Sequence, residues 1–163
     1  MIEVDVAFSG SSTKAPGHAG FAEALNSLKP VRVSGSSGGA IVAAAWSLRG
    51  SEFVKEMVVN TNFKKYLKVN WWSLAKFAFY GYVSNGDALY KDLQRAFRRH
   101  TFSSPKLSSD LYITASNMTD GELEIYSRET TPTMPLALAV YRSVTLPGVF
   151  KPKDRGRKKI FMS

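Results

Sequence analysis

Hydrophobic and polar positions follow two different rhythms along the first fifty residues. In the opening stretch every second residue is apolar, from Ile2 to Phe8, which is the period of a half-buried strand. Further on, apolar residues recur at helical spacing until Pro30 ends the first helical run. These patterns predict a strand at 2–8, a small-residue loop at 9–17, a helix at 18–29, a strand at 31–33, a tight turn at 35–39 and an apolar helix at 40–48. This order of elements predicts a parallel α/β sheet.

The rest of the chain continues with helices and a hairpin. Leu89, Leu93 and Phe97 mark one face of a helix that ends near His100. The other predicted elements are a helix at 52–60, strands at 111–114 and 123–126 around a turn at 119–121, a helix from 135 to 141 and the start of a strand at 159–162. We find no internal repeat and no long linker, so the pattern favours one domain.

Composition narrows the class of protein. In 163 residues, 44% are hydrophobic and 21% are charged, which excludes disordered, coiled-coil and collagen-like chains. The lack of cysteine excludes disulfides, a thiolate nucleophile and Cys-based metal sites, and we expect neither a metal nor a cofactor. No apolar run is long enough to span a membrane, and the acidic N-terminus is unlike a secretory signal, so we expect a soluble cytoplasmic protein.

The formal net charge of +9 predicts a polyanionic partner, either nucleic acid or an anionic membrane surface. Aromatic residues and lysines are interleaved from 62 to 82, a pattern that fits a bilayer interface, a lid over an acyl groove or a pair of core-packing helices with solvated lysines. The run 151–159 holds six basic residues against Asp154 alone and is expected to be a solvated loop. Because no RNA- or DNA-binding signature accompanies the charge, we expect no nucleic-acid partner.

The sharpest chemical signal is Gly-Ser-Ser-Gly-Gly at 35–39, which fits the pattern Gly-x-Ser-x-Gly around Ser37. A serine hydroxyl is a poor nucleophile, so an enzyme lifts it clear of the backbone on a strained strand-to-helix turn whose glycines allow close approach. Here the pattern lies between a predicted strand and an apolar helix, as that chemistry requires. We therefore predict Ser37 as a nucleophile in an elbow formed by Gly35, Gly38 and Gly39. A glycine-rich turn without chemistry is the alternative.

The loop at 9–17 is the second signal. In a parallel sheet its backbone amides lie at the same carboxyl edge as Ser37, where they could form an oxyanion hole. Ser, Thr and Lys after a strand also suggest phosphate binding, but the pattern Gly-x-x-x-x-Gly-Lys-Ser/Thr is absent.

Several segments together resemble the patatin-like phospholipases. They are Phe-Ser-Gly at 8–10 followed by Lys14, His-Ala-Gly at 18–20, the stretch 33–44 around Ser37, Ile-Thr-Ala-Ser-Asn-Met-Thr-Asp-Gly at 113–121, and the stretch 139–150 with Ser-x-x-x-Pro-x-x-Phe. The motifs keep the family's order across nearly the whole chain. The resemblance implies a central, mostly parallel sheet flanked by helices, related to the α/β-hydrolase arrangement.

The resemblance also implies a serine lipid acyl hydrolase with a Ser–Asp dyad and no catalytic histidine. Ser37 would attack a fatty acyl ester while the amides of Gly10, Ser11 and Ser12 hold the oxyanion. A carboxylate with a raised pKa can accept the serine proton directly. His18 is then expected to be a helix N-terminal or packing residue, and His100 a residue at a helix C-terminus.

The sequence departs from the family in two places. Ser11, Ser12 and Ala15 stand where glycine is usual, and a left-handed backbone at such residues costs about 1 kcal/mol or more. The family's dyad aspartate follows the strand that corresponds to 159–162, in an Asp-Gly-Gly or Asp-Gly-Ala motif that this sequence lacks. We therefore expect residues 1–163 to form a single patatin-like domain that stops short of the motif. The alternatives are a pseudoenzyme or a substitute base, namely Asp120 or Asp154, and basic neighbours would lower the pKa of Asp154.

These observations predict a phospholipase A-type hydrolase that acts on membrane phospholipids and associates peripherally with an anionic membrane surface. A catalytically inactive lipid- or partner-binding module with the same fold is the alternative, because the dyad aspartate is missing from the sequence. A nucleic-acid-binding protein is the third hypothesis.

Overall fold

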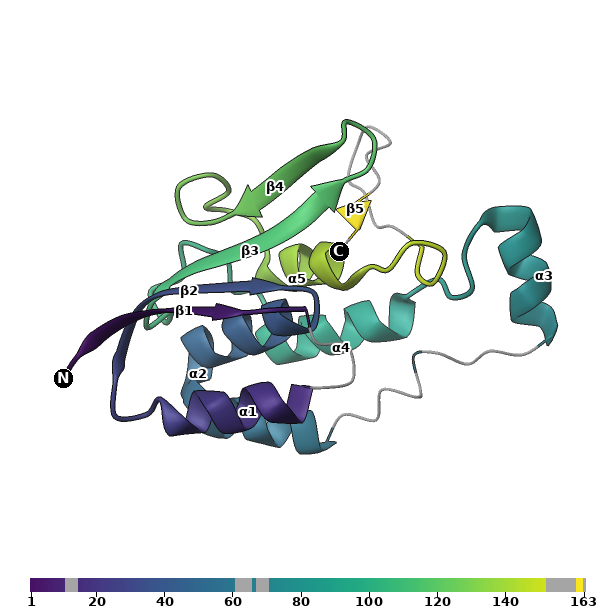
Figure 1. Ribbon diagram of the computed structural model, residues 1–163. Helices are drawn as coiled ribbons and strands as arrows, with labels where there is room; N and C mark the ends of the chain where they lie inside the picture. Colours follow the sequence, from purple (N-terminus) through teal and green to yellow (C-terminus); the bar gives the residue numbers. More distant parts are fainter. Residues whose placement is uncertain (11–14, 61–65, 67–70, 152–160, 163) are drawn as a thin grey trace.

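The computed structural model describes residues 1–10, 15–60, 66, 71–151 and 161–162 (Figure 1). Its elements in chain order are β1 (Glu3–Phe8), α1 (Ala15–Ala24), β2 (Lys29–Ser36), α2 (Gly38–Asn60), α3 (Trp71–Tyr80), α4 (Asp87–Phe97), β3 (Asp110–Asn117), β4 (Glu122–Tyr126), α5 (Leu136–Val144) and β5 (Phe161–Met162). The predicted strands, the β3–β4 hairpin and the helices on either side of it are all present.

The sheet has the order β1-β2-β3-β4, with β5 added to the end of β3. β1 pairs with β2 and β2 pairs with β3 in parallel, which confirms the predicted parallel sheet. β4 and β5 are both antiparallel to β3. Because β1, β2 and β3 run in the same direction, their carboxyl ends meet at one edge, and loops that follow the strands lie close together there.

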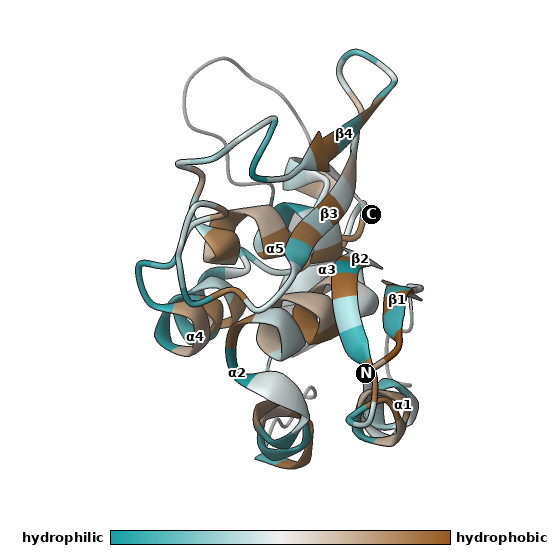
Figure 2. Ribbon diagram, turned by 90° about the vertical axis from the view of Figure 1, so that its left-hand side faces the viewer, coloured by the Kyte–Doolittle hydropathy of each residue, from teal (hydrophilic) through white to brown (hydrophobic). Residues whose placement is uncertain are grey.

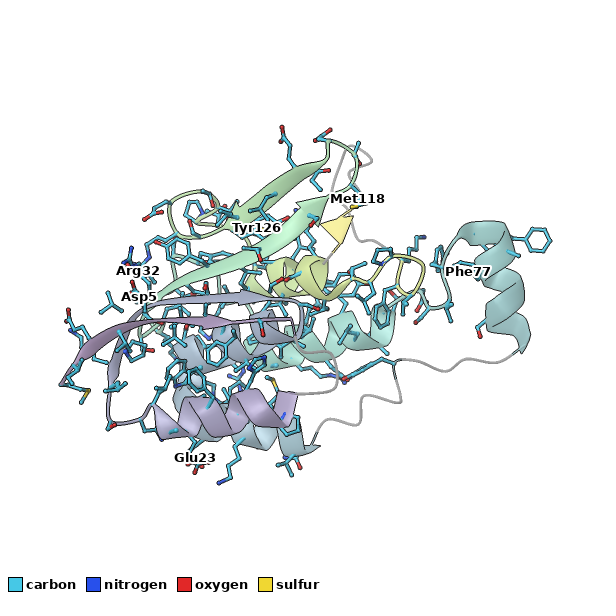
Figure 3. The ribbon with its side chains drawn as sticks, in the orientation of Figure 1. Asp5, Glu23, Arg32, Phe77, Met118 and Tyr126 are labelled. Atoms are coloured by element: carbon cyan, nitrogen blue, oxygen red, sulfur yellow. The ribbon has the colours of Figure 1, made fainter. Side chains whose placement is uncertain are left out.

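The helices that pack against the sheet lie on one of its faces (Figures 1 and 2). On that face the strands bury apolar side chains, among them Phe8, Val33 and Ile113. On the other face Asp5 and Arg32 are exposed (Figure 3), and within the described residues no helix covers that face. Parallel strands are usually apolar on both sides because helices cover both faces. The alternation read from residues 2–8 follows from this one-sided covering.

Two helices form the centre of the core. The first part of α2 is buried from Gly38 to Leu48 except for the partly exposed Ile41, as its apolar sequence predicts. Gly50 then breaks the helical geometry with φ 78° and ψ −177°, so α2 consists of two helical segments, in agreement with the separate helices expected at 40–48 and 52–60. In α5, every residue except Arg142 is buried.

The first helix differs from its prediction. Helical spacing predicts a helix at 18–29, whereas α1 spans Ala15–Ala24 and Pro30 lies inside β2. The helix starts earlier because proline is tolerated in a first helical turn, where Pro16 stands. Pro30 is tolerated in β2 because β3 pairs only from Arg32 onward, so that part of β2 lies along an open edge.

The helix α3 projects away from the sheet and its packed helices (Figure 1). Its residues Phe77, Phe79 and Tyr80 are exposed, so the core-packing interpretation is wrong for them. Tyr66, from the same aromatic stretch, is buried instead and donates a hydrogen bond to Asp92 Oδ2 at 2.7 Å. Among the described residues, no helix is long and apolar enough to cross a bilayer.

Candidate active site

Ser37 occupies the junction between the end of β2 and the start of α2, as the strand–turn–helix prediction requires. Its backbone is left-handed, with φ 52°, and among the described residues only Arg98 is another non-glycine with positive φ. Such a conformation costs an ordinary L-residue about 1–2 kcal/mol, so the surrounding structure must hold it in place. A strained serine at a sharp strand-to-helix turn has the geometry of a nucleophile elbow.

The glycines around Ser37 allow a close approach of three backbone segments. A Cβ added to Gly35 would lie 2.5 Å from the carbonyl oxygen of Gly39, so the strand and the helix could not pass with a side chain there. A Cβ on Gly39 would collide with the carbonyl oxygens of Phe8 and Ser9 at the end of β1. Gly38 is the buried first residue of α2. Glycine at 35 and 39 therefore brings the end of β1 against the start of α2.

The loop after β1 lies beside the candidate nucleophile. A Cβ built on Gly10 would lie 3.5 Å from the Cβ of Ser37, which is ordinary van der Waals contact. The two sites predicted from separate motifs, Gly10 and Ser37, are thus neighbours at the carboxyl edge of the sheet. Ser11 and Ser12, the other two predicted oxyanion residues, lie outside the described residues, so their role stays a prediction.

His18 supports this loop. Its Nε2 lies 3.1 Å from the carbonyl oxygen of Ser9, and its ring packs edge-on against Phe8 at 5.5 Å between centroids. Phe8 makes a similar edge-on contact with Trp46 of α2 at 5.6 Å. His18 is therefore a packing residue near the start of α1, as expected.

Ser143 is a residue of the site that sequence reasoning missed. Its Oγ, on the fully buried side of α5, accepts a hydrogen bond from the backbone N–H of Ser37 at 2.8 Å. This contact joins residues 106 positions apart and helps to fix the left-handed turn. It also occupies the N–H of Ser37 itself. Oxyanion donors must then come from the β1 loop and the amides of the first turn of α2.

The end of α5 is held by further hydrogen bonds. Thr145 Oγ1 donates to the carbonyl oxygen of Tyr141 at 2.7 Å, and the Tyr141 hydroxyl donates to the carbonyl oxygen of Lys151 at 2.8 Å. Burial raises the pKa of Tyr141 above its ordinary value, so this hydroxyl remains a donor throughout the physiological pH range. These bonds fix the helix that carries Ser143.

Of the two substitute bases, only Asp120 lies in the described part of the chain. It stands in the turn between β3 and β4, where its Oδ2 accepts a hydrogen bond from Asn117 Nδ2 at 2.8 Å. Asn117 is fully buried, and its Oδ1 accepts the backbone N–H groups of Thr119 and Asp120. Asp120 therefore has a structural part in the hairpin turn. Asp154 lies outside the described residues.

The direction of β5 bears on where a base could stand. β5 is antiparallel to Ser116 and Asn117 at the end of β3. β4 pairs with the same two residues along one edge of β3, so β5 must lie along the other edge. β2 pairs along that same edge with the preceding residues of β3, and its pairing ends at Ser36. A chain that continues β5 along β3 therefore runs towards the end of β2 and towards Ser37.

A hollow on the uncovered face of the sheet is a second polar site. It has a volume of about 390 Å³ and is lined in part by Asp5, Arg32 and Tyr112. Arg32 donates to Asp5 from Nε at 3.1 Å and from Nη2 at 2.5 Å, and this bonding holds the pKa of the Asp5 carboxyl below its ordinary value. The two charged groups of this hollow, Asp5 and Arg32, are paired with each other, and the hollow has no nucleophile in a strained turn. Within the described residues, no group of three His, Asp or Glu side chains could hold a metal ion.

Comparisons with known proteins bear on the fold and the family. A family model described as Patatin-like phospholipase matches residues 6–162. No curated protein matches the chain. Among solved structures, VipD from Legionella pneumophila is similar with a TM-score of 0.65 and 17% identity, over 97% of this chain and 45% of VipD.

Two structures of ExoU are also similar. The type III effector protein ExoU matches with a TM-score of 0.56 and 18% identity, over 91% of this chain and 40% of that one. Full-length ExoU from Pseudomonas aeruginosa, in complex with SpcU, matches with a TM-score of 0.58 and 17% identity. This match covers 90% of this chain and 38% of that one. The chain spans less than half the length of these proteins, and at such identities the likeness is one of fold.

Proposed function

Because the chain belongs to the patatin-like phospholipase family, we propose that it is a serine lipid acyl hydrolase of the phospholipase A type, which cleaves fatty acyl esters of membrane phospholipids. The observation that carries the proposal is the left-handed Ser37 at the β2–α2 junction, with the Gly10 loop in contact with it. A turn without chemistry would place glycine or asparagine in such a conformation at lower cost.

In the proposed reaction, Ser37 Oγ attacks the ester carbonyl carbon and its proton passes to a carboxylate base. The tetrahedral oxyanion accepts hydrogen bonds from amides of Gly10, Ser11 and Ser12, with the N-terminus of α2 favouring the negative charge. Collapse breaks the ester C–O bond, and the lysophospholipid alkoxide takes the proton back from the base. Water then attacks the acyl-Ser37 carbonyl carbon and gives a proton to the same carboxylate. The bond between the acyl carbon and Ser37 Oγ breaks, Ser37 Oγ takes that proton back from the base, and the fatty acid is released.

We place the base directly after β5. β5 runs along β3 towards the end of β2, so a carboxylate at the start of the segment that follows it would lie near Ser37. The hydrogen bond from Asn117 assigns Asp120 to the hairpin turn instead. Residues 1–163 then form a single patatin-like domain that carries the nucleophile and the oxyanion loop.

A catalytically inactive lipid- or partner-binding module is the second candidate. It is favoured by Ser11 and Ser12, which stand where the family usually has glycine in the oxyanion loop. Such a module would keep the fold and the elbow but would not acylate Ser37.

Covalent labelling separates the two candidates. A fluorophosphonate should label the wild-type chain once at Ser37, and Ser37→Ala should abolish the labelling. Ser36→Ala, a change at the neighbouring residue of β2, is the matched control and should leave the labelling in place. The activity assay uses a chain in which an aspartate follows β5, with phosphatidylcholine vesicles as substrate. Mass spectrometry should then detect lysophospholipid and free fatty acid in equal amounts. Esterase activity that survives Ser37→Ala would reject the nucleophile assignment, and an unlabelled Ser37 would favour the binding module.

A further inference from the structure

A second hollow, at the opposite end of the sheet from Ser37, is lined by basic side chains, and we call it the cationic hollow. Its volume of about 380 Å³ is within the range of small-molecule sites. It is formed where the first part of α2 ends, where α4 ends and where the loop 98–109 leads into β3. The lining residues are Leu48, Arg49, Ala96, Arg98, His100 and Lys106.

The cationic hollow lies far from the candidate active site. β3 starts directly after the loop 98–109, so the hollow is at the amino edge of the parallel strands, whereas Ser37 follows β2 at the carboxyl edge (Figure 1). The first part of α2 runs from one edge to the other, and the stretch from Ser37 to Arg49 spans about 18 Å at the usual helical rise. A ligand in the cationic hollow is therefore separate from an ester held at Ser37.

The basic side chains of the cationic hollow have no acidic partners. Within the described part of the chain, no ion pair and no side-chain hydrogen bond is formed by Arg49, Arg98 or Lys106. The guanidinium carbon of Arg49 lies 3.9 Å from the centre of the Phe53 ring, and this contact orients the group without neutralising its charge. The positive charge of the hollow is thus available to a ligand.

Helix ends account for only part of this charge. α4 ends at Phe97 and the first part of α2 ends before Gly50, and each helix C-terminus carries the equivalent of about −0.5 charge. Two such ends amount to about −1, whereas Arg49, Arg98 and Lys106 carry one positive charge each. An excess of about +2 remains, and a phosphomonoester, with a charge of about −1.5 to −2 at neutral pH, balances it.

Arg98 is held in a conformation that glycine adopts more easily. It ends α4 with φ 50° and ψ −129°, and a residue with positive φ at the end of a helix is usually glycine. Strained backbone persists only where the surrounding structure holds it, and it is concentrated at active sites and ligand clamps. The side chain that glycine would lack lines the cationic hollow. The strain therefore points to a binding role for this guanidinium.

Hydrogen bonds fix the loop 98–109 on both sides of the cationic hollow. The backbone N–H of Leu136 donates to the carbonyl oxygen of His100 at 2.9 Å. At the other side, the backbone N–H of Ser108 donates to the carbonyl oxygen of Ser47 at 2.7 Å. The basic residues thus stand on a frame that is ordered before a ligand arrives, which lowers the entropy cost of binding.

From these observations we propose that the cationic hollow binds a small soluble phosphomonoester. Arg49, Arg98 and Lys106 bind the phosphate oxygens, and Leu48 and Ala96 supply apolar surface for the carbon part of the ligand. The volume fits one small phosphorylated molecule, whereas a nucleic-acid strand needs a groove that continues along the surface. The proposal does not depend on the proposed reaction at Ser37.

Isothermal titration calorimetry of the full chain tests the cationic hollow, with glycerol 3-phosphate as the probe. Dimethyl phosphate, which carries a single negative charge, should bind at least about tenfold more weakly, because the second charge of the phosphomonoester also interacts with the excess of about +2. Raising the salt concentration from about 0.1 M to about 0.5 M should weaken the binding of glycerol 3-phosphate severalfold. Equal binding of the two probes, or no binding of glycerol 3-phosphate below about 10 mM, would overturn the proposal.

Variants at matched positions separate the cationic hollow from positive charge in general. Arg98→Gln should weaken the binding of glycerol 3-phosphate about tenfold or more, whereas Arg99→Gln, at the exposed next residue outside the lining, should change it less than about twofold. Lys106→Gln should also weaken binding, and Lys91→Gln, on the exposed side of α4, is its control. Equal losses in the test and control variants would reject the hollow as the site.

Arg98→Gly guards against loss of binding through misfolding. Glycine adopts a φ of 50° without strain, so the midpoint of urea denaturation should rise while binding weakens as it does in Arg98→Gln. An Arg98→Gly chain that binds glycerol 3-phosphate with unchanged affinity would overturn the proposal.

Two further arms distinguish a soluble ligand in the cationic hollow from a lipid headgroup and from a ligand at the active site. Phosphatidic acid carries the same phosphomonoester, and Arg98→Gln should change binding to phosphatidylcholine vesicles with about 10% phosphatidic acid less than about twofold. Vesicle binding that requires Arg98, with no binding of glycerol 3-phosphate, would overturn the assignment to a soluble ligand. Glycerol 3-phosphate should bind the Ser37→Ala chain as it binds the unchanged chain, and loss of binding in Ser37→Ala would place the ligand at the active site instead.

Discussion

At the scale of single residues, Ser37 and Ser143 illustrate what a sequence can and cannot disclose. Ser37 is identifiable because its chemistry needs glycines at fixed local spacing, and those glycines are visible in the sequence. Ser143 contributes through one hydrogen bond to the N–H of Ser37, across 106 positions. Nothing local to α5 indicates that contact, because it depends on how α5 packs against the start of α2.

Loss of the Ser143 hydroxyl should loosen the elbow. Ser143→Ala leaves the Ser37 N–H without its acceptor, and the loss of this partly buried hydrogen bond should cost about 0.5–1.5 kcal/mol in the free energy of unfolding. Urea denaturation should show this loss, and fluorophosphonate labelling of Ser37 should slow because the serine is no longer held in its left-handed turn. Thr145→Val is the control, since it removes a buried hydroxyl at the same helix end that bonds to Tyr141 and not to Ser37. Equal slowing in both variants would reduce Ser143 to a general packing role.

At the scale of elements, local patterns predict most of the fold. The alternation in β1, the hairpin of β3 and β4 and the buried face of α4 all follow from periodicity within a few residues. The prediction that Pro30 ends a helix is wrong, because the effect of this proline depends on whether a neighbouring strand needs the N–H that proline lacks. That information lies in β3, about eighty residues further on, which starts to pair only at Arg32. Residue spacing cannot supply such long-range pairing.

Gly86 fixes the junction between α4 and α5. A comparison with Gly121 separates the effect of a steric clash from the effect of backbone strain. A Cβ on Gly86 would collide with the hydroxyl of Tyr141, and its φ is 69°. Gly121, in the hairpin turn, has φ 71° and open space around it. Gly121→Ala should therefore cost about 1 kcal/mol of unfolding free energy, and Gly86→Ala about 2–4 kcal/mol, because the clash adds to the strain. Equal midpoints in urea denaturation would show that Tyr141 moves aside freely.

At the scale of the whole molecule, the candidate site was predictable as far as the parallel sheet determines it. Parallel strands bring their carboxyl ends together, so the sequence alone predicts that the loop of Gly10 and the turn of Ser37 lie at one edge, where the two residues are neighbours. The course of β5 could not be predicted in this way, because it depends on which edge of β3 is free. β4 pairs along one edge of β3, which leaves the other edge to β5.

The same one-sided architecture distributes stability unevenly. α5 is buried at eight of its nine positions, whereas the last residues of α3, Phe77 to Tyr80, are exposed. Local opening costs least where few apolar contacts are lost, so amide hydrogen exchange in α3 should be much faster than in α5, whose amides should open only with global unfolding. Hydrogen exchange of the lipid-free chain, followed by mass spectrometry of peptides from each helix, measures the difference. Urea at low concentration should then accelerate exchange in α5 and barely affect α3, because only global opening exposes enough surface to respond to denaturant. Equal protection of the two helices would mean that α3 is packed as firmly as the core.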